Sequence, residues 1–319
     1  MDILFVMDPV GSVKWFGDTS FALMLAAQER GHRVFHCQAR DVSLEGGRVR
    51  ATARLASMTD EVDPPIVLGA TFDLDLGNVD AVFVRTDPPM DTRYITLTHL
   101  LDHVRDETLV VNDPRGLRDA NEKIYACRFP DLMPATLVTS DRSKLVAFAE
   151  EHNGAVLKPI DGHGGRGIMA LQPGDRNERA IVDQLTNRGR RQVMAQEFLD
   201  EVFDGDLRVL ILDGEPLGAI LRVPAAGDFR ANIGVGGSVR HVELDAAATD
   251  MVAKMSSTLR ADGLWFVGID VIGGRLSEVN VTSPTGIRQL GRLTGTRPDH
   301  AVIEWVEQRV GAAAGSTAP

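Results

Sequence analysis

Cysteine is scarce in this 319-residue chain, where only Cys37 and Cys127 occur. Two thiols are too few for a disulfide framework, and their separation does not match a metal-ligand motif. The eight histidines also lack metal-site spacing. We therefore expect two reduced thiols in a cytoplasmic protein.

Long apolar runs are also missing. The first run, residues 3–7, is too short for the apolar core of a signal peptide and lacks a basic segment before it. No run approaches the roughly 18 residues of a membrane span. The net charge of −11 argues against a non-specific nucleic-acid surface or an anionic-membrane surface. We expect small-molecule substrates, with no nucleic-acid or membrane partner.

What the chain does contain is enough apolar sequence, 44% of its residues, for a large core divided into two or three lobes. Short apolar runs alternate with helical patterns, which predicts an α/β fold. In the first 120 residues we expect strands at 3–7, 33–37, 81–84 and 108–111, and a helix capped by Asp18 or Thr19. A hairpin is expected at 42–44 and 49–53, and a long surface connection at about 57–78.

The apolar patterns of the second half of the chain predict further strands and two helices. Strands are expected at 155–157, 168–171, 193–198, 207–212 and 217–223, and a hairpin at 266–272 and 276–281. The helices are expected at 249–262 and 299–310. The small residues of 311–319 predict a disordered tail.

A glycine-rich loop follows the predicted strand 155–157. Gly162-x-Gly164-x-x-Gly167 matches the dinucleotide-binding pattern, but that pattern needs a helix after the glycines. Another short apolar run follows instead, so we interpret the segment as a strand–loop–strand flap that covers nucleotide phosphates. Lys158, just before the loop, could meet the enclosed anion. A plain flexible hairpin is the alternative.

An acidic residue interrupts the apolar strand 266–272. Burying the Asp270 carboxylate alone is costly, so a cation or a donor should accompany it. Glu278 and Asn280 lie two residues apart on the returning strand and share one face. Such oxygen ligands suit Mg²⁺. A surface hairpin with solvated acids is the alternative.

The register of this hairpin can be predicted from its turn. A two-residue turn at Gly273-Gly274 would pair Asp270 with Ser277 and leave Glu278 on the opposite face. Bringing Asp270 and Glu278 together requires an odd loop, such as 273–275 with a glycine at positive φ.

Several motifs occur together in a recognisable order. They are Asn121-Glu122-Lys123, Leu157-Lys158-Pro159, the 161–167 loop, Ala195-Gln196-Glu197-Phe198-Leu199, Asp206-x-Arg208 and Asp270…Glu278-x-Asn280. This order resembles the ATP-grasp superfamily, and Glu278-Val279-Asn280-Val281-Thr282-Ser283-Pro284-Thr285 resembles the bacterial glutathione synthetase family within it. The resemblance covers essentially the whole chain apart from the tail.

The resemblance implies an ATP-grasp fold behind an N-terminal open α/β (pre-ATP-grasp) domain. The expected domains are 1–120, a substrate domain; 121–200, the ATP-lid subdomain; and 201–319, the metal-bearing catalytic subdomain with its tail. A homo-oligomer, either a tetramer or a dimer, is also implied.

The resemblance further implies a role for each motif. ATP would be bound through its phosphates by Lys123, Lys158 and the loop glycines Gly162, Gly164, Gly165 and Gly167. The adenine would lie by Gln196, Glu197, Phe198 and Leu199, and the ribose by Asp206. Two Mg²⁺ ions, or Mn²⁺, would be held by Asp270, Glu278 and Asn280. Catalysis would involve Arg208, Lys158 and Asn280. Substrate contacts would come from Arg85, Ser283, Thr285 and Arg288, and from Arg230 and Asn232 on a lid at 224–238.

The activity implied is the ATP-dependent ligation of γ-glutamylcysteine to glycine through an acyl phosphate, which yields glutathione, ADP and phosphate. Two alternatives stay open at this point. One is another ATP-grasp amide or peptide ligase with a different carboxylate or amine substrate. The other is a non-catalytic, nucleotide-binding regulatory protein, against which the complete set of charged motif residues argues.

Overall fold

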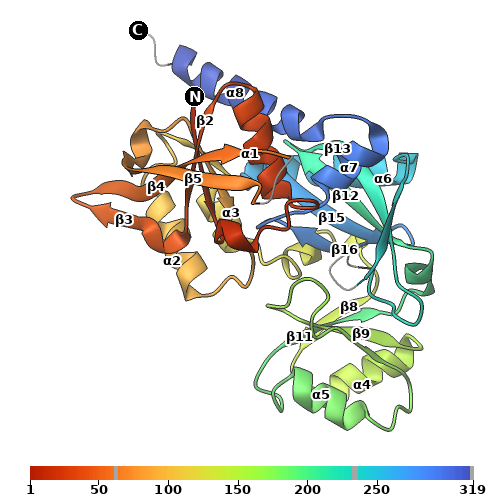
Figure 1. The fold of residues 1–319 in the computed structure, drawn as a ribbon. Coiled ribbons are helices and arrows are strands. Elements are labelled where there is room, and N and C mark those ends of the chain that lie inside the picture. The colour runs from red at the N-terminus through yellow and green to blue at the C-terminus, as the bar shows by residue number, and fades with distance from the viewer. Residues whose placement is uncertain (61–63, 232–235, 317–319) are drawn as a thin grey trace.

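The computed structural model describes residues 1–60, 64–231 and 236–316. These residues form three β-sheets with helices packed against them, and the middle part of the chain projects as a separate lobe (Figure 1). The α/β prediction is confirmed. Within the described residues, no helix combines the length and apolarity needed to cross a membrane.

The N-terminal sheet has the strand order β3-β4-β2-β1-β6-β7, with β5 paired to β4. Its strands are β1 (Asp2–Met7), β2 (Arg33–Cys37), β3 (Val42–Glu45), β4 (Arg48–Met58), β5 (Ile66–Asp75), β6 (Ala81–Arg85) and β7 (Leu109–Val111). Its helices are α1 (Thr19–Glu29), α2 (Thr92–Leu101) and α3 (Pro114–Asp119). Asp18 caps α1 as predicted, because its side chain accepts a hydrogen bond from the Phe21 amide. Parallel β2, β1 and β6 form the buried centre of this sheet, and β7 continues the parallel pairing at its edge.

The predicted surface connection at about 57–78 is wrong for residues 66–75, which form β5 and pair antiparallel with β4. Residues 61–63 lie outside the described part of the chain. The aspartates of β5 suggested a loop, yet they serve as cross-strand ion-pair partners. Asp73 is 2.6 Å from Arg50, and Asp75 is 2.6 Å from Arg48. Opposite charges on neighbouring strands favour pairing of those strands.

The projecting lobe contains a four-stranded sheet in the order β10-β9-β11-β8. The strands are β8 (Thr136–Thr139), β9 (Ala155–Pro159), β10 (Met169–Leu171) and β11 (Val193–Glu197). Helices α4 (Arg142–Glu151) and α5 (Glu178–Leu185) cover the face of this sheet that is turned away from the rest of the molecule (Figure 1). Leu145, Leu157, Val182 and Val193 are among the fully buried side chains of this lobe's own core.

The third sheet has the order β14-β13-β12-β15-β16 and is antiparallel throughout. The strands are β12 (Asp206–Leu212), β13 (Glu215–Val223), β14 (Ser238–His241), β15 (Phe266–Ile272) and β16 (Arg275–Asn280). The helices that follow or interrupt them are α6 (Ala246–Ala261), α7 (Ile287–Thr294) and α8 (Pro298–Ser316). Short 3₁₀ turns complete the chain: η1 (Val10–Ser12), η2 (Ala39–Asp41), η3 (Leu76–Asn78), η4 (Tyr125–Arg128), η5 (Pro130–Leu132) and η6 (Asp200–Phe203).

The predicted disordered tail is also wrong for most of its length. Helix α8 continues through 311–316, where three successive alanines favour helix, and residues 317–319 lie outside the described part of the chain. α8 packs on α1. The guanidinium of Arg30, which follows α1, contacts Glu304 and Glu307 of α8. The C-terminal helix thereby rests on the N-terminal sheet.

Candidate active site

A cavity between the second and third sheets collects most of the residues expected to bind a nucleotide. Apolar side chains from Val156, Ile168, Phe229 and Ile272 form part of its wall. The predicted site residues in its lining are Lys158, Gln196, Glu197, Phe198, Leu199, Asp206, Arg230, Asp270 and Glu278. We call this space the nucleotide cavity.

Lys158 is a buried cation whose hydrogen bonds go to neutral groups. Its Nζ donates to the Gln196 side-chain oxygen and, at 2.8 Å, to Ser277 Oγ. Burial lowers the pKa of Lys158, although the charges of Glu278, Asp206 and Asp270 act in the opposite direction. A buried ammonium with neutral partners favours the arrival of an anion, so Lys158 is suited to a phosphate.

The glycine loop is a strand–loop–strand flap, as predicted. β9 and β10 pair antiparallel around it, with Leu157 opposite Met169. Gly164 and Gly165 have φ values of 60° and 75°, which only glycine adopts readily. Lys123 Nζ donates to the Gly162 carbonyl at the start of the loop and lies 3.1 Å from Glu278 Oε1. Lys123 thus connects the flap to the β15–β16 hairpin.

The β15–β16 hairpin brings Asp270 and Glu278 directly opposite each other on one face. The predicted odd loop at 273–275 was wrong, because Gly273-Gly274 forms a two-residue turn that pairs Ile272 with Arg275. A β-bulge then shifts the register between Asp270 and Val271 and leaves Ser277 as the extra residue. The bulged Ser277 supplies the hydroxyl that Lys158 binds.

Two arginines neutralise the buried acids of the third sheet. Arg208 stands opposite Asp270 across β12 and β15, and Arg222 stands opposite Asp206 across β12 and β13. Arg208 donates to both Asp270 oxygens at 2.5 and 3.0 Å, while Arg222 Nη2 lies 2.5 Å from Asp206 and 2.9 Å from Asp270. Burial alone would raise the pKa of Asp270, but both guanidiniums hold it well below its usual range. Burial raises the pKa of Asp206 to about 6.

A second cavity adjoins this network, and we call it the acceptor cavity. Arg208 and Arg222 line it from the sheet side, and His163 and Gly164 line it from the glycine loop. The rest of its lining is Asp87, Pro88, Glu122, Asn280, Thr282, Ser283 and Thr285. Arg208 Nη1 donates to the Thr285 carbonyl at 3.0 Å, which fixes the turn after β16 against the third sheet.

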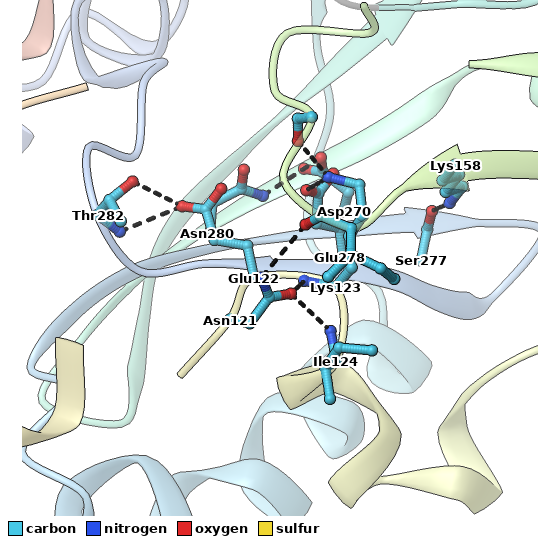
Figure 2. Close-up of polar contacts among 12 residues, drawn as sticks. Asn121, Glu122, Lys123, Ile124, Lys158, Asp270, Ser277, Glu278, Asn280 and Thr282 are labelled. Carbon is cyan, nitrogen blue, oxygen red and sulfur yellow. Dashed lines mark hydrogen bonds and ion pairs between the residues drawn. The ribbon is translucent and has the colours of Figure 1, made fainter. Parts of the chain in front are cut away.

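Figure 2 shows the segment 121–124 beneath the hairpin, with its side chains pointing to different parts of the site. Asn121 Nδ2 donates to the Ile160 carbonyl at 3.2 Å, before the glycine loop. The Glu122 carboxylate accepts hydrogen bonds from Thr282, as Figure 2 shows. Asn280 Nδ2 lies 3.4 Å from Asp270 Oδ2.

The site also contains residues that were not among the predicted site residues, and Glu122, Arg222 and Ser277 make its main additional polar contacts. Glu122 stood inside a recognised motif, and Arg222 follows an apolar run on β13, so each had a sequence signal. Ser277 had none, because its place depends on the bulge.

The remaining predicted substrate residues lie in different places. Arg85 is buried, and it donates to Ser20 Oγ and to the Pro284 carbonyl, both at 3.0 Å. Arg230 Nη1 lies 3.4 Å from the Gly165 carbonyl, so the 224–231 segment touches the glycine loop. Arg288 lies apart from both cavities, paired with Asp60 at 2.8 Å and stacked 5.0 Å from the Phe21 ring centre. Asn232 lies outside the described residues.

Known proteins resemble this chain over nearly its full length. Residues 1–118 match the N-terminal domain of prokaryotic glutathione synthetase, and residues 122–295 match its ATP-grasp domain. The glutathione synthetase of Thermosynechococcus vestitus is 44% identical over 316 residues, covering 96% of this chain and 99% of that protein. The glutathione synthetase of Nostoc sp. is 42% identical, covering 97% and 99%.

Solved structures agree on the fold at low sequence identity. The D-cycloserine synthetase DcsG superposes with a TM-score of 0.64 at 16% identity, covering 95% of this chain and 99% of that one. The ATP-grasp ligase PsnB gives 0.63 at 18% identity, covering 96% and 98%. With the family domains matched from residue 1 to residue 295, the chain belongs to the prokaryotic glutathione synthetase family, whose members are ATP-dependent ligases of the ATP-grasp fold.

Proposed function

We propose that this enzyme ligates γ-glutamylcysteine to glycine, using ATP, and releases glutathione, ADP and phosphate. The observation that carries the proposal is the Arg208–Asp270 pair. Asp270 lines the nucleotide cavity, Arg208 lines the acceptor cavity, and the two side chains are hydrogen-bonded to each other. A phosphoryl donor and its acceptor would therefore meet across one buried ion pair.

In the nucleotide cavity, we propose that Lys123 and Lys158 bind the ATP phosphates beneath the loop glycines Gly162, Gly164, Gly165 and Gly167. The segment 196–199 would hold the adenine through backbone groups, and Asp206 would hold the ribose. Phosphoryl transfer requires mainly positioning and neutralisation of negative charge. Both lysines are buried, so they would neutralise the negative charge of the phosphates with little competition from water.

The oxygen donors of the hairpin fit Mg²⁺ in their chemistry. Asp270 and Glu278 are cross-strand partners, and Asn280 lies two residues further along the same face. In the described residues no group of three His, Cys, Asp or Glu is arranged to hold a metal alone, so phosphate oxygens would have to complete the coordination. Asp270, Glu278 and Asn280 would hold one or two Mg²⁺ ions, which would supply neutralisation of the phosphate charge.

The chain's own residues would then carry the reaction as follows. The carboxylate of γ-glutamylcysteine attacks the γ-phosphate, and the amine of glycine attacks the resulting acyl phosphate, with release of phosphate. Arg208 would stabilise the negative charge that develops in both steps. Arg85, Ser283 and Thr285 are proposed to bind substrate carboxylates, and Arg288 could join them only by leaving Asp60.

The 224–238 segment is proposed as a lid that excludes water from the acyl phosphate. Phe229 packs 5.8 Å from the ring centre of Phe198, and Arg230 contacts the glycine loop. The lid would therefore close over the nucleotide cavity, with Arg230 facing the substrates.

The test is phosphate release from ATP with γ-glutamylcysteine and a panel of amines, followed by identification of the product. Glycine should give the highest kcat/KM, and glutathione should be formed. A preference for another amine would instead identify a related ATP-grasp ligase. We also propose that the enzyme is a cytoplasmic homo-oligomer with domains at 1–120, 121–200 and 201–319.

A further inference from the structure

Glu122 lies where the two matched family domains meet, and it is bound to the strand that carries the metal ligands. Its backbone carbonyl accepts a hydrogen bond from the Val279 amide at 3.1 Å. Its side-chain Oε1 accepts three more, from the amides of Val281 and Thr282, both at 3.2 Å, and from Thr282 Oγ1 at 2.7 Å. Asn280 is the last residue of β16 to pair with β15. The carboxylate therefore accepts hydrogen bonds from the Val281 and Thr282 amides, which have no partner in the sheet beyond the end of β16.

The other oxygen of this carboxylate is differently placed. All three side-chain hydrogen bonds go to Oε1, and among the described residues none donates to Oε2. The side chain is partly accessible and lines the acceptor cavity beside Asn280, Thr282 and Ser283. One oxygen is thus fixed by the protein, and the second remains available within the cavity.

Charge balance indicates what this oxygen would bind. Arg208 and Arg222 are each paired with Asp270 or Asp206, and Lys123 is paired with Glu278. Within the described part of the chain, Glu122 makes no ion pair with any side chain. Burial and the nearby charge of Glu278 raise the pKa of Glu122, and a bound cation would relieve both effects.

We propose that Glu122 Oε2 binds the ammonium group of the acceptor amino acid and takes up the proton that the ammonium must lose. The neutral nitrogen is then held for attack on the acyl phosphate, whose C–O bond to phosphate breaks as the amide forms, and the second proton leaves with the phosphate. The proposal rests on the proposed function, because it assumes an amine acceptor in this cavity. Glu122 would then select primary amines that carry a positive charge at neutral pH. The same carboxylate would hold the 281–285 turn in place through Oε1.

Glu122→Gln separates these two roles, because an amide oxygen can still accept the three bonds at Oε1 while the negative charge is lost. We expect kcat/KM for glycine to fall roughly 10–100-fold, the range for a lost charge-assisted hydrogen bond. Hydroxylamine, which is uncharged at neutral pH, should trap the acyl phosphate at nearly the wild-type rate. The KM for ATP should also remain close to wild type.

Glu151→Gln is the matched control, because Glu151 is exposed on α4 and lines neither cavity. The proposal is overturned if Glu122→Gln uses glycine as well as Glu151→Gln does. It is also overturned if Glu122→Gln lowers the reaction rates with glycine and with hydroxylamine equally, since that result would mean that Glu122 has only a structural role. Wild-type enzyme that uses no amine with γ-glutamylcysteine would instead reject the proposed function itself.

Discussion

Arg208 and Asp270 stand directly opposite each other on neighbouring strands, joined by two hydrogen bonds of 2.5 and 3.0 Å. Both side chains are buried, and they line different cavities. A planar guanidinium matches a carboxylate in this bidentate way, whereas an ammonium does not. The pair therefore links the nucleotide cavity to the acceptor cavity by fixed geometry.

Replacing Arg208 should affect turnover more than ATP binding. If Arg208 stabilises charge in the transition state, Arg208→Ala should lower kcat by roughly 10²–10³, comparable to the loss of an oxyanion donor. Arg208→Lys should lower kcat less than Arg208→Ala does, because lysine keeps the positive charge but cannot form the bidentate contact of a guanidinium. Steady-state kinetics with ATP titration provides the measurement. A variant whose defect lies only in ATP affinity would show that Arg208 has another role.

The same substitution should also reduce stability. Removing one partner of a buried ion pair typically costs about 3–5 kcal/mol, because the other charge loses its compensation. Here Arg222 remains 2.9 Å from Asp270, so we expect a loss below that range. Urea denaturation of the Arg208→Ala variant, compared with Arg275→Ala at the exposed first residue of β16, would measure this loss of stability.

Neutralising either carboxylate of the hairpin should nearly abolish turnover at saturating Mg²⁺. Asp270→Asn and Glu278→Gln keep side-chain size but remove the charges that attract a divalent cation. Mg²⁺-dependent ATP binding, measured by calorimetry, should weaken in both variants, and Arg275→Ala should behave like wild type. Full activity of either variant would exclude the hairpin from the catalytic site.

The lid can be tested through the contact between Phe229 and Phe198. Phe229→Ala should raise the KM for ATP, because it removes an aromatic partner from the wall of the nucleotide cavity. Limited proteolysis should cut within 224–238 in free enzyme and more slowly once a nucleotide and the acceptor are bound. Phe203→Ala, which alters an exposed ring that also packs on Phe198, is the control for general loosening. Equal cleavage with and without ligands would remove the basis for a lid.

The contact between α1 and α8 predicts a pH effect on stability. The Arg30 guanidinium lowers the pKa of Glu307 from 4.5 to about 2. A carboxylate with a lowered folded-state pKa stabilises the fold fully above its unfolded pKa, and that contribution is lost as pH falls toward 2. Glu307→Gln should therefore be less stable than wild type at pH 7, by an amount within about 1 kcal/mol, as for surface pairs.

Urea denaturation at pH 7 and at pH 3 would check this difference, which should be smaller at the lower pH. Glu304→Gln is the matched control, because Glu304 contacts the same arginine but its side chain is 52% exposed against 30% for Glu307. A difference between wild type and Glu307→Gln that is unchanged by pH would contradict the ion-pair explanation.

The sequence by itself determined the family-level features of this protein. The apolar run after the glycine loop predicted a flap rather than a Rossmann turn, and β9 and β10 confirm it. An aspartate inside an apolar strand predicted a buried partner for Asp270, and the structure supplies Arg208 and Arg222. Such signals are local, so spacing and hydrophobicity are enough to reveal them.

Only the tertiary structure decided which distant groups meet. The bulge at Ser277 sets the Asp270–Glu278 register, and it depends on the packing of three strands rather than on the turn sequence. Residues 66–75 became a strand because the long β4 offered an edge with complementary charges. Glu122 binds Thr282 across 160 positions of sequence. Contacts of this kind arise from long-range chain closure, which no local pattern encodes.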